Sequence, residues 1–264
     1  MPHHLQSAAS QINTHTFSER LGWSRCLGVP NDPPAKPLNT YLLVGIVRSM
    51  APRPTNQAPD RGDARTRLLE AARDIIRAKG YAATTVDDLC RAAEVTKGAF
   101  FHHFVSKEAL GVAAAEYWAE TTSALFAGAP YHAPADSLDR VLAYVAFRRA
   151  IISGTTAEFT CLAGTMIQEV HDTSDPIREA CGRAILGHAA TLIADIEAAR
   201  KIHGITANWT AESLARHTQA VLQGAFILAK AGDNAELARE SVDHLERYIR
   251  LLFNLPEVRH DHAE

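Results

Sequence analysis

Residues 84–110 read TTVDDLCRAAEVTKGAFFHHFVSKEAL, a stretch with three helix-start signals close together. Thr85 can cap a first helix, and Asp88 stands three residues later, where it can return the hydrogen bond of a capping box. Thr96 and Ser106 can cap the next two helices with their hydroxyl oxygens. The first two helices are short and only a tight turn separates them. This spacing predicts a helix-turn-helix arrangement.

The second short helix has two different faces. Phe100 and Phe104 are four residues apart and should face inward together. The side chains of Lys97, Ala99, Phe101, His102 and His103 point outward. Gly98 and Ala99 are small, so the backbone can closely approach a partner. A short helix with its N-terminal residues exposed fits the major groove of DNA. The residues that we expect to contact DNA are Thr85, Thr96, Lys97, Gly98, Ala99, Phe101, His102, His103 and Lys107.

Phosphate contacts should add to this interaction. Lys97 supplies positive charge, and His103 and Lys107 can reach phosphates on the flanks of the groove. Backbone N–H groups at the capped helix starts can also bind phosphate. Ionic phosphate contacts release counterions, so we expect binding to weaken steeply with salt.

The block from about Arg65 to Leu110 resembles the DNA-binding segment of the TetR family of bacterial repressors. The caps, the Lys-Gly pair, the aromatic-His-Phe block and the Ser-Lys-Glu run all occur in the family's register. Glu94 replaces the usual turn glycine, Phe101 replaces a common tyrosine, and His102 stands where a second aromatic is usual. The resemblance implies a DNA-binding regulator with an all-α fold.

Composition is that of an ordinary globular chain, with 264 residues, 47% hydrophobic and 22% charged. The net charge is −3, and the part before residue 118 is slightly basic whereas the rest is acidic. No apolar run is long enough to span a bilayer, and no secretory signal is recognisable. Cys26, Cys90, Cys161 and Cys181 show no CxxC spacing, which favours free thiols in a reducing compartment. We therefore expect a cytoplasmic protein.

Residues 1–62 differ from the rest because prolines are frequent and no helical period persists. Two interpretations stay open: the segment is a flexible tail, or translation of the natural protein starts at Met50. From Asp63 onward, apolar periodicity predicts helix after helix, and no alternating strand pattern occurs. The predicted helices after the front block are 106–126, 137–152, 158–170, 175–203, 210–232 and 235–254. The predicted organisation is 1–62 extension, 63–110 DNA-binding domain, 111–256 helical effector-binding and dimerisation domain, and 257–264 tail.

The last two predicted helices carry apolar seams with alternating spacings of four and three residues. Such seams pack helices at shallow angles, within one chain or between chains. The TetR resemblance implies that these helices also pair with their copies in a homodimer, which would place two recognition helices about 34–36 Å apart. The predicted interface residues are Leu214, Thr218, Val221, Ala225, Leu228, Val242, Leu245, Ile249 and Leu252.

The resemblance also implies a small-molecule pocket in the middle helices. An apolar wall would favour a mostly apolar or aromatic effector. The candidate pocket residues, each of which could equally be plain core, are Trp118, Phe126, Phe147, Phe159, Met166, Gln168, His171 and His188.

Two other functions compete with an effector-controlled repressor. One is a constitutive DNA-binding regulator without an effector, and the other is an enzyme that uses the cavity. No catalytic or nucleotide-binding motif supports the enzyme. We expect no cofactor. We also expect no metal site, because the adjacent His102 and His103 do not face one another on a helix.

Overall fold

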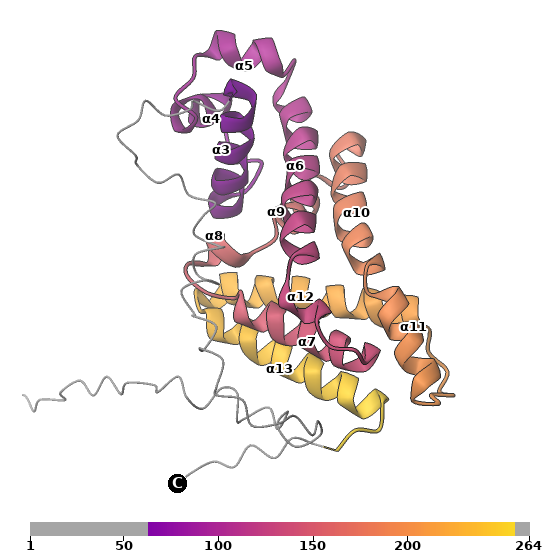
Figure 1. Ribbon diagram of the computed structural model, residues 1–264. Helices are drawn as coiled ribbons and strands as arrows, with labels where there is room; N and C mark the ends of the chain where they lie inside the picture. The colour runs from indigo at the N-terminus through magenta and orange to yellow at the C-terminus, as the bar shows by residue number, and fades with distance from the viewer. Residues whose placement is uncertain (1–62, 257–264) are drawn as a thin grey trace, which may run out of the picture. The chain divides into compact units, whose positions relative to one another are not determined.

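Helices joined by short turns make up residues 63–256, the part of the chain that the computed structural model describes (Figure 1). No strand occurs among these residues, so the all-α prediction is confirmed. The two interpretations of the first 62 residues, and the predicted tail, lie outside the described range. The helices are α3 (Ala64–Lys79), α4 (Val86–Ala92), α5 (Lys97–His103), α6 (Lys107–Ala127), η3 (Pro130–His132), α7 (Ser137–Ala150), α8 (Thr156–Phe159), α9 (Leu162–Val170), α10 (Asp175–Ala190), α11 (Ile193–Ile202), α12 (Ala211–Gly232) and α13 (Ala235–Leu252).

The three predicted helix caps in the front block are confirmed. The Thr85 hydroxyl accepts a hydrogen bond from the Asp88 backbone at 3.1 Å, and the Asp88 carboxylate accepts from the Thr85 N–H at 3.0 Å. Thr96 caps α5 and Ser106 caps α6 through equivalent bonds of 3.1 and 3.0 Å. Each cap satisfies a backbone donor that the helix leaves without an intrahelical partner.

Two of the later segments, each predicted to form one continuous helix, form two helices instead. The segment 175–203 forms two helices, α10 and α11, because the chain turns at Thr191 and Leu192. The Thr191 hydroxyl bonds the His188 carbonyl at 2.8 Å, and the turn brings Leu192 into the core. The Ser174 side chain caps α10. The segment 158–170 is likewise divided into α8 and α9, with extended backbone at Thr160.

One hydrophobic core joins the front helices to the middle of the chain. It combines buried side chains of α3 to α6 with those of α9 and α10: Leu68, Leu69, Ile76, Leu89, Phe100, Phe104, Leu110, Leu162, Met166, Ile177 and Cys181. The front helices therefore share their core with α9 and α10, which lie beyond residue 110. The domain boundary at that residue stays a prediction.

A second core lies where α7, α11, α12 and α13 pack together (Figure 1). The seams predicted to form the dimer interface belong mostly to this core. Since α7 and α11 cover these faces within one chain, the buried residues present no surface to a second subunit: Leu214, Thr218, Ala225, Val242, Leu245 and Ile249. Val221 and Leu252 are half-buried against the same core, and Leu228 is exposed. No helix among residues 63–256 is long and apolar enough to cross a membrane.

Candidate DNA-binding and effector sites

The turn between α4 and α5 is held from several sides. Glu94 adopts a left-handed backbone conformation with φ of 52° at the position where the resembled family has glycine. The Val95 N–H donates to the Cys90 carbonyl at 3.0 Å and closes the turn. From α3, the Arg67 guanidinium donates to the Ala93 carbonyl at 3.0 Å. These bonds fix the orientation of α5 relative to α4.

The two faces of α5 are those that the sequence predicts. Phe100 is fully buried and Phe104 is 4% exposed, and both lie in the core that α3 and α6 share. On the outer side, Phe101 is 54% exposed, and Lys97 and His102 are exposed as well. A short helix anchored by aromatic side chains thus presents a polar and aromatic face to the outside.

Lys97 is exposed but has an acidic neighbour. Its ammonium lies 2.7 Å from the carboxylate of Asp87 on α4, and both side chains are more than half exposed. The hydrogen bond that Lys97 donates to Asp87 raises the pKa of Lys97. An exposed ion pair of this kind is weak, because water and salt screen it. A phosphate group can therefore replace Asp87 as the partner of Lys97 at little cost.

The side chains of His103 and Lys107, which are also predicted to contact DNA, are less exposed than that of Lys97. His103 is half-buried, with Nε2 3.7 Å from the Asp63 carboxylate. Lys107 is half-buried above the Tyr81 ring and donates to the Ala82 carbonyl at 3.3 Å. Burial lowers the pKa of Lys107. To reach a phosphate, Lys107 must leave this position.

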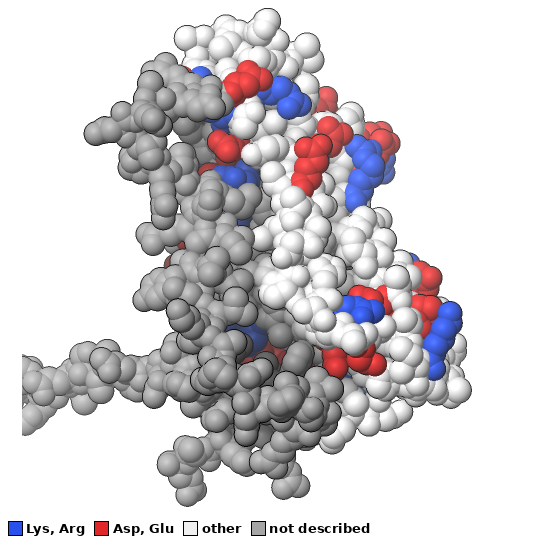
Figure 2. All heavy atoms as spheres, viewed as in Figure 1, with Lys and Arg blue, Asp and Glu red and all other residues white. Residues whose placement is uncertain are grey.

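The remaining predicted contacts also lie on the α4–α5 side. Thr85, Thr96 and Gly98 are exposed, and Ala99 is half-buried. On the face that Figure 2 presents, Lys and Arg side chains lie beside Asp and Glu side chains, so no broad patch of one sign covers it.

A cleft of about 940 Å³ runs between α3, α6 and the back helices. Half of the predicted pocket residues line it: Trp118, Phe126, Phe159 and His188. The other half do not. Phe147 and Met166 are buried in the two cores, and Gln168 is exposed and bonds the Gly164 carbonyl within α9. His171 is exposed at the end of α9.

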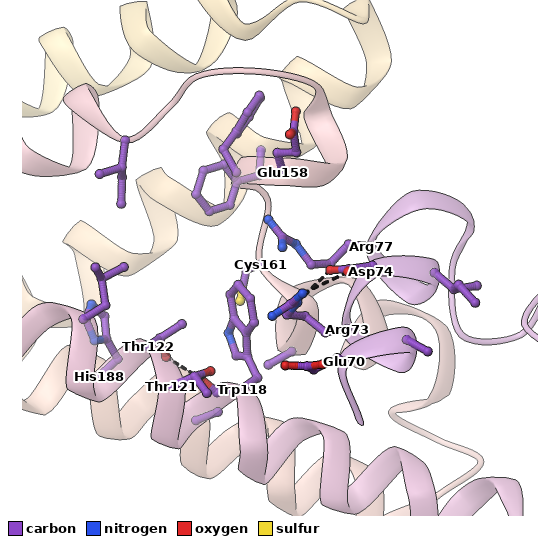
Figure 3. A pocket seen from close by; sticks show the side chains of 18 of the residues that line it. Glu70, Arg73, Asp74, Arg77, Trp118, Thr121, Thr122, Glu158, Cys161 and His188 are labelled. Carbon is purple, nitrogen blue, oxygen red and sulfur yellow. Dashed lines mark hydrogen bonds and ion pairs between the residues drawn. The ribbon is translucent and has the colours of Figure 1, made fainter. Parts of the chain in front are cut away.

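Charged side chains of α3 line one side of the cleft. Figure 3 shows Arg73 and Arg77 reaching toward Trp118 from one side, with His188 at the other. Arg77 stacks over the Trp118 ring at 5.0 Å and donates to the Thr160 carbonyl at 2.9 Å. Burial lowers the pKa of Arg77 to about 10, so this guanidinium stays charged at neutral pH. The cleft thus directly contacts a helix of the DNA-binding segment.

A polar cluster lies at the opposite side of the cleft. The Tyr144 hydroxyl lies 2.9 Å from His188 Nε2 and accepts a bond from the Gln219 amide at 3.1 Å. Arg148 is buried next to them and lines the cleft together with Gln219. Burial, and then the charge of Arg148, lower the pKa of His188 to about 3, so the imidazole is neutral.

The sequence interpretation missed Arg148, Arg77 and Gln219 because charged and amide side chains usually face solvent. A positional signal was available for two of them. Arg148 falls on the apolar stripe of its helix, seven residues after Val141 and four after Tyr144. Gln219 similarly falls three residues before Leu222. A polar residue on such a stripe is buried by its position, as both are here.

Helix α9 connects the cleft to the front helices. Ala163 at its start lines the cleft, and Glu169 near its end bonds the turn between α3 and α4. The two Glu169 carboxylate oxygens accept from the backbone N–H groups of Tyr81 at 3.1 Å and Ala82 at 2.6 Å. A movement of α9 in response to a ligand would therefore be transmitted to this turn.

The other ionisable residues give no sign of a metal or disulfide site within residues 63–256. No group of three or more His, Cys, Asp or Glu side chains in that range could hold a metal ion. Cys90 and Cys181 are buried free thiols, and Cys161 is a half-buried free thiol at the cleft.

Comparison with known proteins agrees with this architecture. The family described as "Bacterial regulatory proteins, tetR family" matches residues 68–114, and "Tetracyclin repressor-like, C-terminal domain" matches residues 137–245. The HTH-type transcriptional repressor NemR of Escherichia coli (strain K12) is 29% identical over 194 residues, which cover 71% of this chain and 94% of NemR.

Solved structures show the same fold. The crystal structure of the reduced form of E. coli NemR aligns with a TM-score of 0.60 and 28% identity, over 70% of this chain and 96% of that chain. A TetR transcriptional regulator from Chloroflexus aurantiacus aligns with a TM-score of 0.62 and 26% identity, over 72% of this chain and 95% of that chain. Since both the front and the back of the sequence match, the chain belongs to the TetR family of bacterial regulatory proteins and is a DNA-binding transcriptional regulator, not an enzyme.

Proposed function

We propose that this regulator is a homodimeric repressor that leaves a palindromic operator when a small effector enters the cleft. The exposed outer face of α5 is the observation that carries the proposal. Its relative NemR is a repressor, and the family acts on DNA. The effector we expect has an apolar body, since Trp118, Phe126 and Phe159 line the cleft.

At the operator, α5 enters the major groove. Lys97 exchanges Asp87 for a DNA phosphate, while Gly98 and Ala99 permit a close approach of the backbone. Phe101 and His102 complete the exposed face. The predicted phosphate contacts of His103 and Lys107, and of the capped helix starts at Thr85 and Thr96, lie on the flanks.

The dimer forms through the exposed sides of α12 and α13 rather than through their buried seams. Four large apolar side chains are exposed on these two helices, with Ile227 and Leu228 on α12 and Tyr248 and Leu251 on α13. On α12, Gly224 opens onto free space, so a second helix can approach closely there. Exposed apolar side chains on adjacent helices are typical of an interface between subunits.

Effector binding acts on DNA binding through α3 and α9. A ligand in the cleft contacts Arg73 and Arg77 of α3, and α9 carries Glu169 to the turn before α4. The ligand releases DNA only to the extent that it prefers the released conformation, and a nearly complete switch needs a preference of about 10⁴-fold. A constitutive regulator would have no use for a cleft that contacts its DNA-binding helices.

The first experiment measures binding to an operator fragment selected from genomic DNA, over a range of salt concentrations. Lys97→Ala should weaken binding and reduce the slope of log K against log salt by about 0.9 for each subunit bound. Asp87→Asn should strengthen binding at low salt, because it removes a carboxylate that competes with phosphate for Lys97.

Lys201→Ala is the matched control, since Lys201 is an exposed lysine on α11. It should leave the slope unchanged. If Lys97→Ala behaves like this control, α5 does not meet the phosphate backbone and the proposal is wrong.

A further inference from the structure

The Arg148 guanidinium lines the cleft and has no charged partner among the described residues. Arg148 is 9% exposed, and its Nε atom has no hydrogen-bond partner. Its Nη1 atom lies 3.5 Å from His188 Nε2, at the outer limit of a hydrogen bond. Within residues 63–256, no carboxylate lies within 4.0 Å of this guanidinium, whereas Arg140 and Arg149 of the same helix each have an aspartate.

The groups around Arg148 are neutral. Burial raises the pKa of Tyr144, so its hydroxyl keeps its proton, and the imidazole of His188 is neutral for the reason given above. The Gln219 amide, which bonds Tyr144, is also uncharged. A buried guanidinium surrounded by neutral groups is unfavourable unless an anion joins it. Such an arrangement is expected where a ligand supplies the missing negative charge.

Aromatic rings flank the same guanidinium. Its carbon lies 5.2 Å from the centre of the Phe126 ring and 5.8 Å from that of Phe226. Both phenylalanines line the cleft, which continues past Trp118 toward α3. A ligand that fits has an acidic head against Arg148 and an apolar or aromatic body along these rings.

We propose that the effector cleft binds organic anions, namely aromatic or long apolar carboxylic or sulfonic acids, and that Arg148 pairs with their acidic group. This rests on the proposed function, in which the cleft is the effector site, and it assigns the chemical class of the effector. Arg148 fixes the orientation of the ligand, so the apolar body extends along Phe126 and Phe226 toward Trp118.

A matched pair of fluorescent probes tests the charge requirement. 8-Anilino-1-naphthalenesulfonate carries a sulfonate, and N-phenyl-1-naphthylamine has the same ring system without it. The full-length wild-type protein should bind the sulfonate more tightly than the neutral amine. Arg148→Met should weaken sulfonate binding at least tenfold and change amine binding by less than threefold. Arg148→Lys, which keeps the charge, should recover part of the sulfonate affinity.

Two further measurements keep the test decisive. Arg183→Met removes an exposed arginine on α10 and should leave both affinities unchanged. Without ligand, Arg148→Met should melt at the same temperature as the wild type or higher, because an unpaired buried charge has been removed. A less stable Arg148→Met protein would show that Arg148 supports the fold, and the inference would be wrong.

The inference is also wrong if the wild type does not bind the sulfonate, or if Arg148→Met loses both probes equally. Operator binding by the ligand-free wild type, measured in parallel, is independent of these results. If the protein binds its operator but does not distinguish the two probes, only the proposed ligand class is wrong. If the ligand-free protein does not bind the operator, the proposed repressor function is wrong.

Discussion

At the scale of single residues, Glu94 shows how the sequence departs from its family at a cost in backbone strain. Its φ of 52° lies in the left-handed region, which costs a residue with a side chain about 1–2 kcal/mol. Substitution by glycine relieves this strain. Part of the gain in stability is offset, because glycine loses more conformational entropy on folding. Glu94→Gly should therefore stabilise the protein by about 0.5 kcal/mol, measured by thermal or urea unfolding.

Glu120→Gly is the control for that substitution. Glu120 is exposed inside α6, where glycine should destabilise the protein by about 1 kcal/mol. If Glu94→Gly destabilises the protein to the same degree, the turn does not hold position 94 in a strained conformation.

Several residues could be predicted from sequence because their reasons are local. The caps at Thr85, Thr96 and Ser106 depend on neighbours within three residues, and the burial of Phe100 and Phe104 follows from helical spacing. The ion pair between Lys97 and Asp87 and the missing partner of Arg148 depend on distances between helices, which local spacing does not specify. Gln168 and His171 were assigned to the pocket by residue type alone, and the structure places both outside it.

At the scale of elements, α9 links the cleft to the turn between α3 and α4 through Glu169. Its carboxylate accepts two backbone N–H groups, and hydrogen bonds to a charged group contribute about 1.5–3 kcal/mol when buried. Because Glu169 is exposed, we expect Glu169→Gln to lower the free energy of unfolding by a smaller amount, about 1 kcal/mol. Amide hydrogen exchange at Tyr81 and Ala82 should become several-fold faster, as measured by NMR.

Glu179→Gln on α10 provides the comparison, because Glu179 is exposed and lies on a neighbouring helix. Exchange at Tyr81 and Ala82 should not change in that variant. Equal exchange rates in Glu169→Gln and the wild type would mean that the carboxylate does not hold the turn.

The ends of helices could be predicted where the sequence has a residue type that ends or caps a helix. Gly80 ends α3 and Thr210 begins α12, as their residue types indicate. The break between α10 and α11 has no glycine or proline, and both helices are amphipathic, so the periodicity predicts one continuous helix. Tertiary packing decides the break, because Leu192 and Ile196 enter the second core.

At the scale of the whole molecule, the proposed dimer depends on the exposed faces of α12 and α13. Leu228 is 53% exposed and Leu251 is 62% exposed in the single chain. Replacing both by glutamate should therefore leave the subunit folded but place charges in the proposed interface. The double variant should sediment as a monomer in analytical ultracentrifugation and bind the palindromic operator at least tenfold more weakly.

Ile202→Glu is the corresponding control, because Ile202 is a similarly exposed apolar residue on α11. That variant should remain a dimer. A double variant that also remains dimeric would place the interface on another surface. The seam residues proposed from sequence have the right period for helix packing, but period alone does not distinguish a partner within the chain from one in a second subunit.

The core that α3 to α6 share with α9 and α10 limits how this regulator can be recombined with its relatives. A hybrid that joins residues 63–110 to the back half of another family member would pack α3, which contacts α9, against foreign side chains in the shared core. We therefore expect a single cut after residue 110 to leave a mismatched core and a less stable hybrid. A working graft has to carry α9 and α10 along with the DNA-reading helices.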